Sequence, residues 1–140
     1  MNGNEYQKLA MRTNDGKNTD RLSDRLYMIE FFRDAEDNSE FKHPCSLCDL
    51  GGILNGCLGL SGEVGEFVDL IKKWIFHEKK MDYGHAMKEL GDVLWYIAMI
   101  CHSFGWSLDS IMEMNIEKLK ARYPEGFSVE KSAHRAADDI

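Results

Sequence analysis

The chain has 140 residues, of which 44% are hydrophobic and 29% are charged, and its formal net charge at pH 7 is -7. This composition predicts one globular domain with a real core and excludes a chain too polar to fold. The acidic balance, without any run of lysine or arginine, argues against nucleic acid as a partner.

Residues 1–7 show no basic stretch followed by an apolar one, so no secretory signal is visible. The longest apolar run, residues 93–101, is too short to cross a bilayer. Without a secretory signal the four cysteines are interpreted as reduced thiols. We therefore expect a cytoplasmic protein with no membrane contact.

The first third of the chain predicts two helices and two loops. Helices are expected over residues 4–12, capped by Asn2 or Asn4, and over about residues 19–35. Residues 13–20 have loop composition, and residues 34–48 are polar and contain His43-Pro44, which is typical of a surface loop. Strand-type alternation is nearly absent, so the whole chain is predicted to be all-α.

A long apolar helix is predicted from about residue 50 to about His77. It carries glycine at every third position, and each glycine costs about 0.5–1 kcal/mol of helix stability relative to alanine. One interpretation is a weak or kinked helix start. The other is that these small residues allow a second helix to approach closely beside Glu63 and Glu66. The glycines are Gly56, Gly59, Gly62 and Gly65.

Two further helices are predicted with clear limits. Asp82 is expected to cap a helix over residues 83–104 that stops at Gly105. Ser107 is expected to cap a helix over residues 108–123, which Pro124 ends. Residues 127–140 are a tail with one or two turns of helix. We predict a single domain over residues 1–140, with a divergent helix and loop segment at 14–49.

Four acids lie on apolar helical stripes rather than on polar faces. Glu63 and Glu66 are three residues apart, and so are Glu89 and Asp92 on the following helix. Residues at this spacing are neighbours on a helix surface, and an acid that points at a core needs a partner. Two such pairs on antiparallel helices predict a site for a hard cation such as Mg²⁺, which prefers oxygen ligands.

Two other interpretations of the acids are weighed. The first is that lysines neutralise them on solvated faces; the candidates are Lys72, Lys73 and Lys88. The second is a di-iron bundle, which requires two Glu-x-x-His motifs on core helices. Glu40 and His43 have that spacing, but Pro44 follows directly, and Asp82 with His85 is only a loose match. The di-iron interpretation is therefore disfavoured.

Three blocks, in order, resemble the MazG-like nucleotide pyrophosphohydrolases of the all-α NTP pyrophosphatase superfamily. They are residues 59–66 (GLSGEVGE), 89–96 (ELGDVLWY) and 115–127 (NIEKLKARYPEGF). The resemblance covers about residues 4–13 and 50–136. It implies a MazG-like bundle of four to five helices with a metal site between two antiparallel core helices. It also implies Mg²⁺-dependent hydrolysis of a nucleoside triphosphate to the monophosphate and pyrophosphate, with Mn²⁺ as a substitute metal.

The resemblance assigns roles to particular residues of this chain. The metal-binding and catalytic residues would be Glu63, Glu66, Glu89 and Asp92. Candidate substrate contacts are Lys72, Lys73, Tyr96, Asn115, Lys118 and Arg122, because lysine and arginine donate to phosphate oxygens. The family works as oligomers, so a homodimer or homotetramer is expected. A non-catalytic helical module that binds nucleotide or a partner is the alternative function.

Residues 14–49 depart from the family pattern, because the chain carries extra helix and loop there. This segment includes His43, Cys45 and Cys48, which with Cys57 could supply zinc ligands. One C-x-x-C is only half of a typical zinc site, so the zinc hypothesis is weak. The departure also leaves the base and sugar preference unpredicted.

Overall fold

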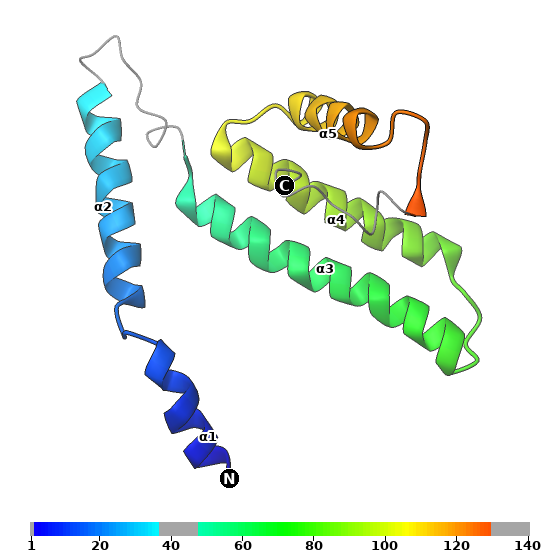
Figure 1. Cartoon of the computed structure of the whole chain (residues 1–140), viewed down its shortest axis with the longest axis horizontal. Coiled ribbons are helices and arrows are strands. Elements are labelled where there is room, and N and C mark those ends of the chain that lie inside the picture. Colours follow the sequence, from blue (N-terminus) through cyan, green and yellow to red (C-terminus); the bar gives the residue numbers. More distant parts are fainter. Residues whose placement is uncertain (1, 37–47, 130–140) are drawn as a thin grey trace. The chain divides into compact units, whose positions relative to one another are not determined.

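The computed structural model describes residues 2–36 and 48–129, and every regular element in that part of the chain is a helix (Figure 1). This confirms the all-α prediction. The chain divides into two compact units, Met1–Leu50 and Gly51–Ile140. The predicted loop around His43 and Cys45, and the end of the tail, lie outside the described residues.

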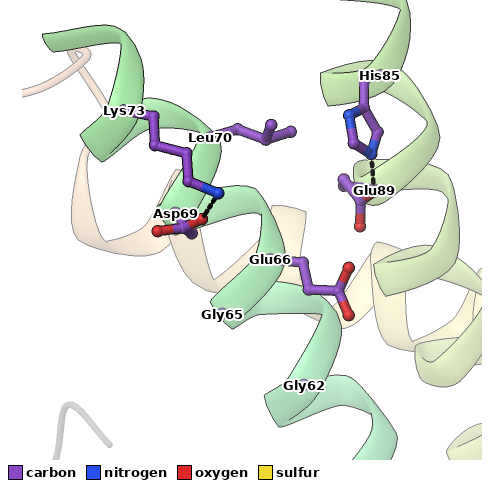
Figure 2. A pocket seen from close by; sticks show the side chains of 8 residues that line it. All are labelled: Gly62, Gly65, Glu66, Asp69, Leu70, Lys73, His85 and Glu89. Carbon is purple, nitrogen blue, oxygen red and sulfur yellow. Dashed lines mark ion pairs between the residues drawn. The ribbon is translucent and has the colours of Figure 1, made fainter. Parts of the chain in front are cut away.

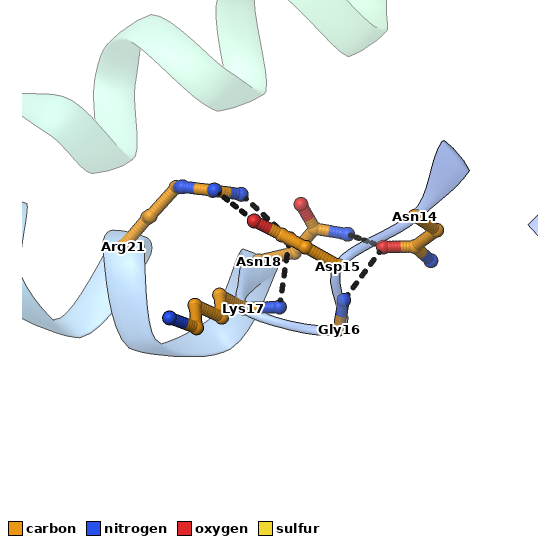
Figure 3. A network of polar contacts seen from close by, with 6 residues as sticks. All are labelled: Asn14, Asp15, Gly16, Lys17, Asn18 and Arg21. Atoms are coloured by element: carbon orange, nitrogen blue, oxygen red, sulfur yellow. Dashed lines mark hydrogen bonds and ion pairs between the residues drawn. The ribbon is translucent and has the colours of Figure 1, made fainter. Parts of the chain in front are cut away.

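The first unit contains two helices. Helix α1, Gly3–Ala10, begins with a capping box in which Asn2 and Glu5 bind each other's backbone N–H groups, as the Asn2 prediction required. A short 3₁₀ turn, η1 (Met11–Thr13), follows, and α2 spans Asn18–Glu36. The guanidinium of Arg21, in the first turn of α2, donates to Asp15 in the loop before that helix (Figure 3). This hydrogen bond holds the pKa of the Asp15 carboxyl below its ordinary value.

The second unit contains α3 (Leu50–Phe76), α4 (Tyr83–Phe104) and α5 (Leu108–Arg122). The predicted limits of α4 are confirmed: the Asp82 carboxylate accepts from the backbone N–H of His85 at 2.9 Å, and Gly105 ends the helix at φ 70°. The Ser107 hydroxyl caps α5. The helices α3 and α4 lie side by side and run in opposite directions (Figure 1).

Two of the four regularly spaced glycines make the close contact between α3 and α4. A Cβ on Gly56 would stand 2.6 Å from Cγ1 of Ile100, and one on Gly59 would overlap the ring of Tyr96. The helix is unbroken from Leu50 to Phe76, so these glycines do not interrupt it. The close-approach interpretation holds, but not at the glycines that flank the acids. A Cβ on Gly62 or Gly65 would meet nothing within 4 Å among the described residues.

Packing among α3, α4 and α5 leaves many large apolar side chains of the second unit exposed. One stripe on α4 consists of Met87, Leu90 and Leu94, and Leu94 is 63% exposed. Trp74 and Trp95 are also exposed, by 47% and 59%. Apolar helical spacing identifies a face to be covered but not what covers it. In the described part of the chain, no helix is long and apolar enough to cross a membrane.

Candidate metal centre

Three carboxylates from α3 and α4 converge on one small volume. An oxygen from each of Glu63, Glu89 and Asp92 lies within 4.8 Å of the others. Glu63 comes from α3, and the other two come from consecutive turns of α4. The structure therefore brings together three of the four predicted metal ligands.

The three acids differ in burial. Glu89 is buried, with 6% of its surface exposed, whereas Glu63 is half-buried and Asp92 is exposed. A buried carboxylate is costly unless a donor or a cation compensates it. The His85 imidazole contacts Glu89, with its Nε2 2.7 Å from Oε1 of the carboxylate. One oxygen of the most buried acid is thus held from outside the cluster.

The surroundings of Glu63 change the pKa of its carboxyl group. Its pKa is raised, first by the loss of solvent around the carboxyl group and then by repulsion from Glu66, Asp92 and Glu89. Such repulsion marks negative charge that the surrounding side chains do not balance. A divalent cation with a preference for oxygen ligands would balance it, so the donor set fits Mg²⁺ or Mn²⁺.

Glu66 lies outside the group of three and faces a neighbouring pocket of about 260 Å³. Figure 2 shows its carboxylate extending from α3 toward the helix that carries Glu89. Gly62 and Gly65 also line this pocket, where their missing side chains leave space. The remaining lining residues are Asp69, Leu70, Lys73, His85 and Glu89.

The two lysines predicted to contact substrate are both paired with one acid. Lys72 and Lys73 each form an ion pair with Asp69, the Lys72 pair at 2.6 Å. Their hydrogen bonds and charge lower the pKa of Asp69 to about 2. The lysines therefore neutralise Asp69 rather than Glu63 or Glu66, which removes them as the partners of the metal-site acids. Of the two, Lys73 lines the pocket.

The other predicted site residues belong neither to the group of three acids nor to the lining of the pocket. Tyr96 is half-buried with its ring against Gly59, so it packs between the helices one turn beyond Asp92. Asn115 and Lys118 are exposed on α5, and the Arg122 guanidinium lies 6.0 Å from the centre of the Tyr123 ring. Their contacts with a substrate stay predictions. Of the proposed zinc ligands, Cys57 is an exposed free thiol, and His43 and Cys45 lie outside the described residues.

Two residues of the site were not assigned a role from the sequence. His85 was considered in a loose di-iron match with Asp82 but was not paired with Glu89, and Asp69 was not recognised as the partner of the lysines. Both contacts join residues three or four positions apart on one helix, the spacing at which side chains meet. That spacing is the signal that could have found them.

Together, the fold and the site define a helical protein with a carboxylate cluster between two antiparallel helices, the arrangement of a divalent-cation centre. The family model of the MazG nucleotide pyrophosphohydrolase domain matches residues 54–127, which include all four acids. The chain belongs to the MazG nucleotide pyrophosphohydrolase family. It is 32% identical to the Gene 37 protein of Mycobacterium phage L5 over 104 residues, 70% of this chain and 90% of the phage protein. No solved structure matches the chain.

Proposed function

We propose that this chain is a Mg²⁺-dependent nucleoside triphosphate pyrophosphohydrolase. It would convert an NTP or dNTP and water to the monophosphate and pyrophosphate. The observation that carries the proposal is the cluster of Glu63, Glu89 and Asp92, because three converging carboxylates lie inside the segment that the family model matches.

The acids of α3 and α4 would hold the cation. Glu63, Glu89 and Asp92 contribute oxygens from the cluster, and Glu66 contributes from the pocket side. When bound, Mg²⁺ supplies charge neutralisation for the phosphate oxygens and polarises the phosphate that is attacked. One of the same carboxylates would accept the proton that the attacking water must lose.

The pocket beside the cluster suits the phosphate chain better than the whole nucleotide. Its volume is about 260 Å³, below the range of roughly 300–1,000 Å³ that is usual for sites enclosing a drug-sized ligand. Lys73 lies on its wall, and an ammonium group there can donate to phosphate oxygens. We therefore favour Lys73 over Lys72 as a phosphate contact, with the base outside this pocket.

We further propose that the protein acts in the cytoplasm as a homodimer or homotetramer. The support is the exposed apolar surface of the isolated chain. Met87, Leu90 and Leu94 form one stripe on α4, and Val64, Val68 and Ile75 form another on α3. Contiguous apolar surface of this kind commonly marks a protein–protein interface.

A nucleotide screen tests the enzymatic proposal. The full chain is incubated with each common NTP and dNTP in the presence of Mg²⁺, and released pyrophosphate is measured. Activity on at least one nucleotide, lost in Glu66→Ala, is expected. If Mg²⁺ and nucleotide stabilise the protein against heat while no product forms, the chain is instead a non-catalytic nucleotide-binding module.

A further inference from the structure

Glu89 is the most buried acid of the cluster, and it is contacted by a residue outside the cluster. His85 lies one helical turn before Glu89 on α4, and its Nε2 is 2.7 Å from Oε1 of Glu89. Figure 2 shows that the imidazole approaches Glu89 from the side away from Glu66. Among the described residues, His85 is not part of the group whose oxygens converge, so it engages Glu89 from outside the cluster.

His85 is itself anchored by the start of the helix. Its backbone N–H donates to Oδ1 of the N-cap residue Asp82 at 2.9 Å. This cap fixes the backbone of the first turn from which the His85 side chain extends. The contact with Glu89 restricts the rotation of the half-exposed imidazole and, through it, the orientation of the buried carboxylate.

The chemistry of the cluster gives this restriction a purpose. Oxygens of Glu63, Glu89 and Asp92 lie within 4.8 Å of one another, so the ionised carboxylates repel one another when no cation is present. A mobile carboxylate would turn away from its neighbours. A donor that holds one oxygen of Glu89 keeps the other in a defined direction, which reduces the reorganisation needed to bind a cation.

We propose that His85 is a positioning residue of the metal centre, which holds Oε1 of Glu89 so that this buried carboxylate is oriented for the cation before the cation arrives. The inference rests on one part of the proposed function, which is that the cluster binds a divalent cation. It adds a residue that lies outside the group of acids and acts through one of them. An ordinary surface ion pair on α4 would instead affect the stability of the helix and leave cation binding unchanged.

Binding of Mn²⁺ alone to the full chain tests the proposal without nucleotide. The dissociation constant is measured by isothermal titration calorimetry and by the electron paramagnetic resonance signal of free Mn²⁺, at a single pH. His85→Ala is expected to weaken Mn²⁺ binding by about 10–100-fold, the usual effect of removing a residue that orients a metal ligand. His85→Gln keeps a donor at similar reach and is expected to bind more tightly than His85→Ala.

Two comparisons keep the outcome decisive. His85→Met resembles His85→Gln in length but cannot donate a hydrogen bond. If His85→Ala fails to fold, weaker Mn²⁺ binding by His85→Met than by His85→Gln is the expected result. His102→Ala removes an exposed histidine near the other end of the same helix and should bind Mn²⁺ as the wild type does. Equal affinity of wild type, Gln and Met variants would overturn the positioning role.

The failures of the two proposals are distinguishable. Wild-type protein that binds Mn²⁺ and hydrolyses nucleotide, with unchanged affinity in His85→Ala, refutes the role of His85 alone. Wild-type protein that binds Mn²⁺ with the expected loss in His85→Ala, but hydrolyses nothing, refutes the enzymatic proposal alone. Wild-type protein that binds no Mn²⁺ refutes both.

Discussion

The ring of Tyr96 on α4 lies directly against the backbone of Gly59 on α3. One turn earlier on α3 and one turn later on α4, Gly56 and Ile100 meet in the same way. Continuing this antiparallel register by one turn places Glu63 opposite Asp92, and these two acids do share the cluster. The glycines therefore set the register that brings the carboxylates of the cluster together.

Gly59→Ala tests this register through stability. Filling a closely packed contact typically costs about 1–3 kcal/mol, which outweighs the gain in helix propensity of about 0.8–1.0 kcal/mol. We expect a net loss of unfolding free energy in urea denaturation. Gly91→Ala on α4 is the matched control, because a Cβ there meets nothing within 4 Å, and it should be neutral or stabilising. Equal stability gains in both variants would show that the Gly59 contact does not constrain the helices.

Asp69 gives a pH dependence with a definite sign. Lys72 and Lys73 lower its pKa in the folded chain to about 2, from an ordinary value of 3.8. The folded state thus releases this proton more readily, so the stabilisation is complete above pH 3.8 and declines as the pH falls toward 2. A carboxyl-carbon NMR titration of Asp69 should show the low pKa, and Lys72→Met combined with Lys73→Met should return it toward the ordinary value. An unchanged titration in the double variant would disprove the lysine pairing.

Charge repulsion in the cluster predicts opposite effects on stability and on cation binding. Because the pKa of Glu63 is raised, its ionised form destabilises the metal-free fold as the pH rises through the carboxyl range. Glu63→Gln should therefore raise the melting temperature in the presence of EDTA. Adding Mg²⁺ should stabilise the wild type, by about 2.7 kcal/mol at a hundredfold excess over its dissociation constant, and should stabilise Glu63→Gln much less.

The matched control for that experiment is Glu113→Gln, an exposed acid on α5. It removes the same charge away from the cluster. A similar loss of the Mg²⁺ response in Glu113→Gln would mean that the response comes from general charge screening rather than from the site.

The exposed stripe on α4 predicts self-association. Leu94→Glu should reduce the mass measured by light scattering on a size-exclusion column, because a charge in an apolar interface is left without water or a partner. Ser110→Glu on the exposed start of α5 should leave the mass unchanged. A wild type that is monomeric at every concentration would rule out the proposed dimer or tetramer.

The helices were predictable because their ends carry local signals. Asp82, Gly105 and Ser107 are themselves cap residues. A cap bonds only to backbone groups a few residues away, so it can be predicted from the local sequence. The four acids were also predictable as a set, since their spacing places each pair on one helix face. Those signals were sufficient for the fold class and for locating the cluster of Glu63, Glu89 and Asp92.

The different roles of the glycines were not predictable, because all four share one spacing. Whether a glycine meets a side chain depends on the register between α3 and α4, which the sequence of either helix alone does not specify. The same limit applies to Trp74 and Trp95: their spacing indicates an apolar face, and their exposure in one chain depends on what packs against it. Glu66 illustrates the point for the site, since its spacing matches Glu63 but its carboxylate faces the pocket.

Phosphorus NMR of the nucleotide reaction tests the central claim most directly. The full chain is mixed with an accepted nucleoside triphosphate while Mg²⁺ is titrated, and the products are read from their separate signals. The account predicts monophosphate and pyrophosphate in equal amounts, dependent on Mg²⁺ and lost in Glu89→Gln. Formation of diphosphate and orthophosphate, or undiminished hydrolysis in EDTA or in Glu89→Gln, would contradict it.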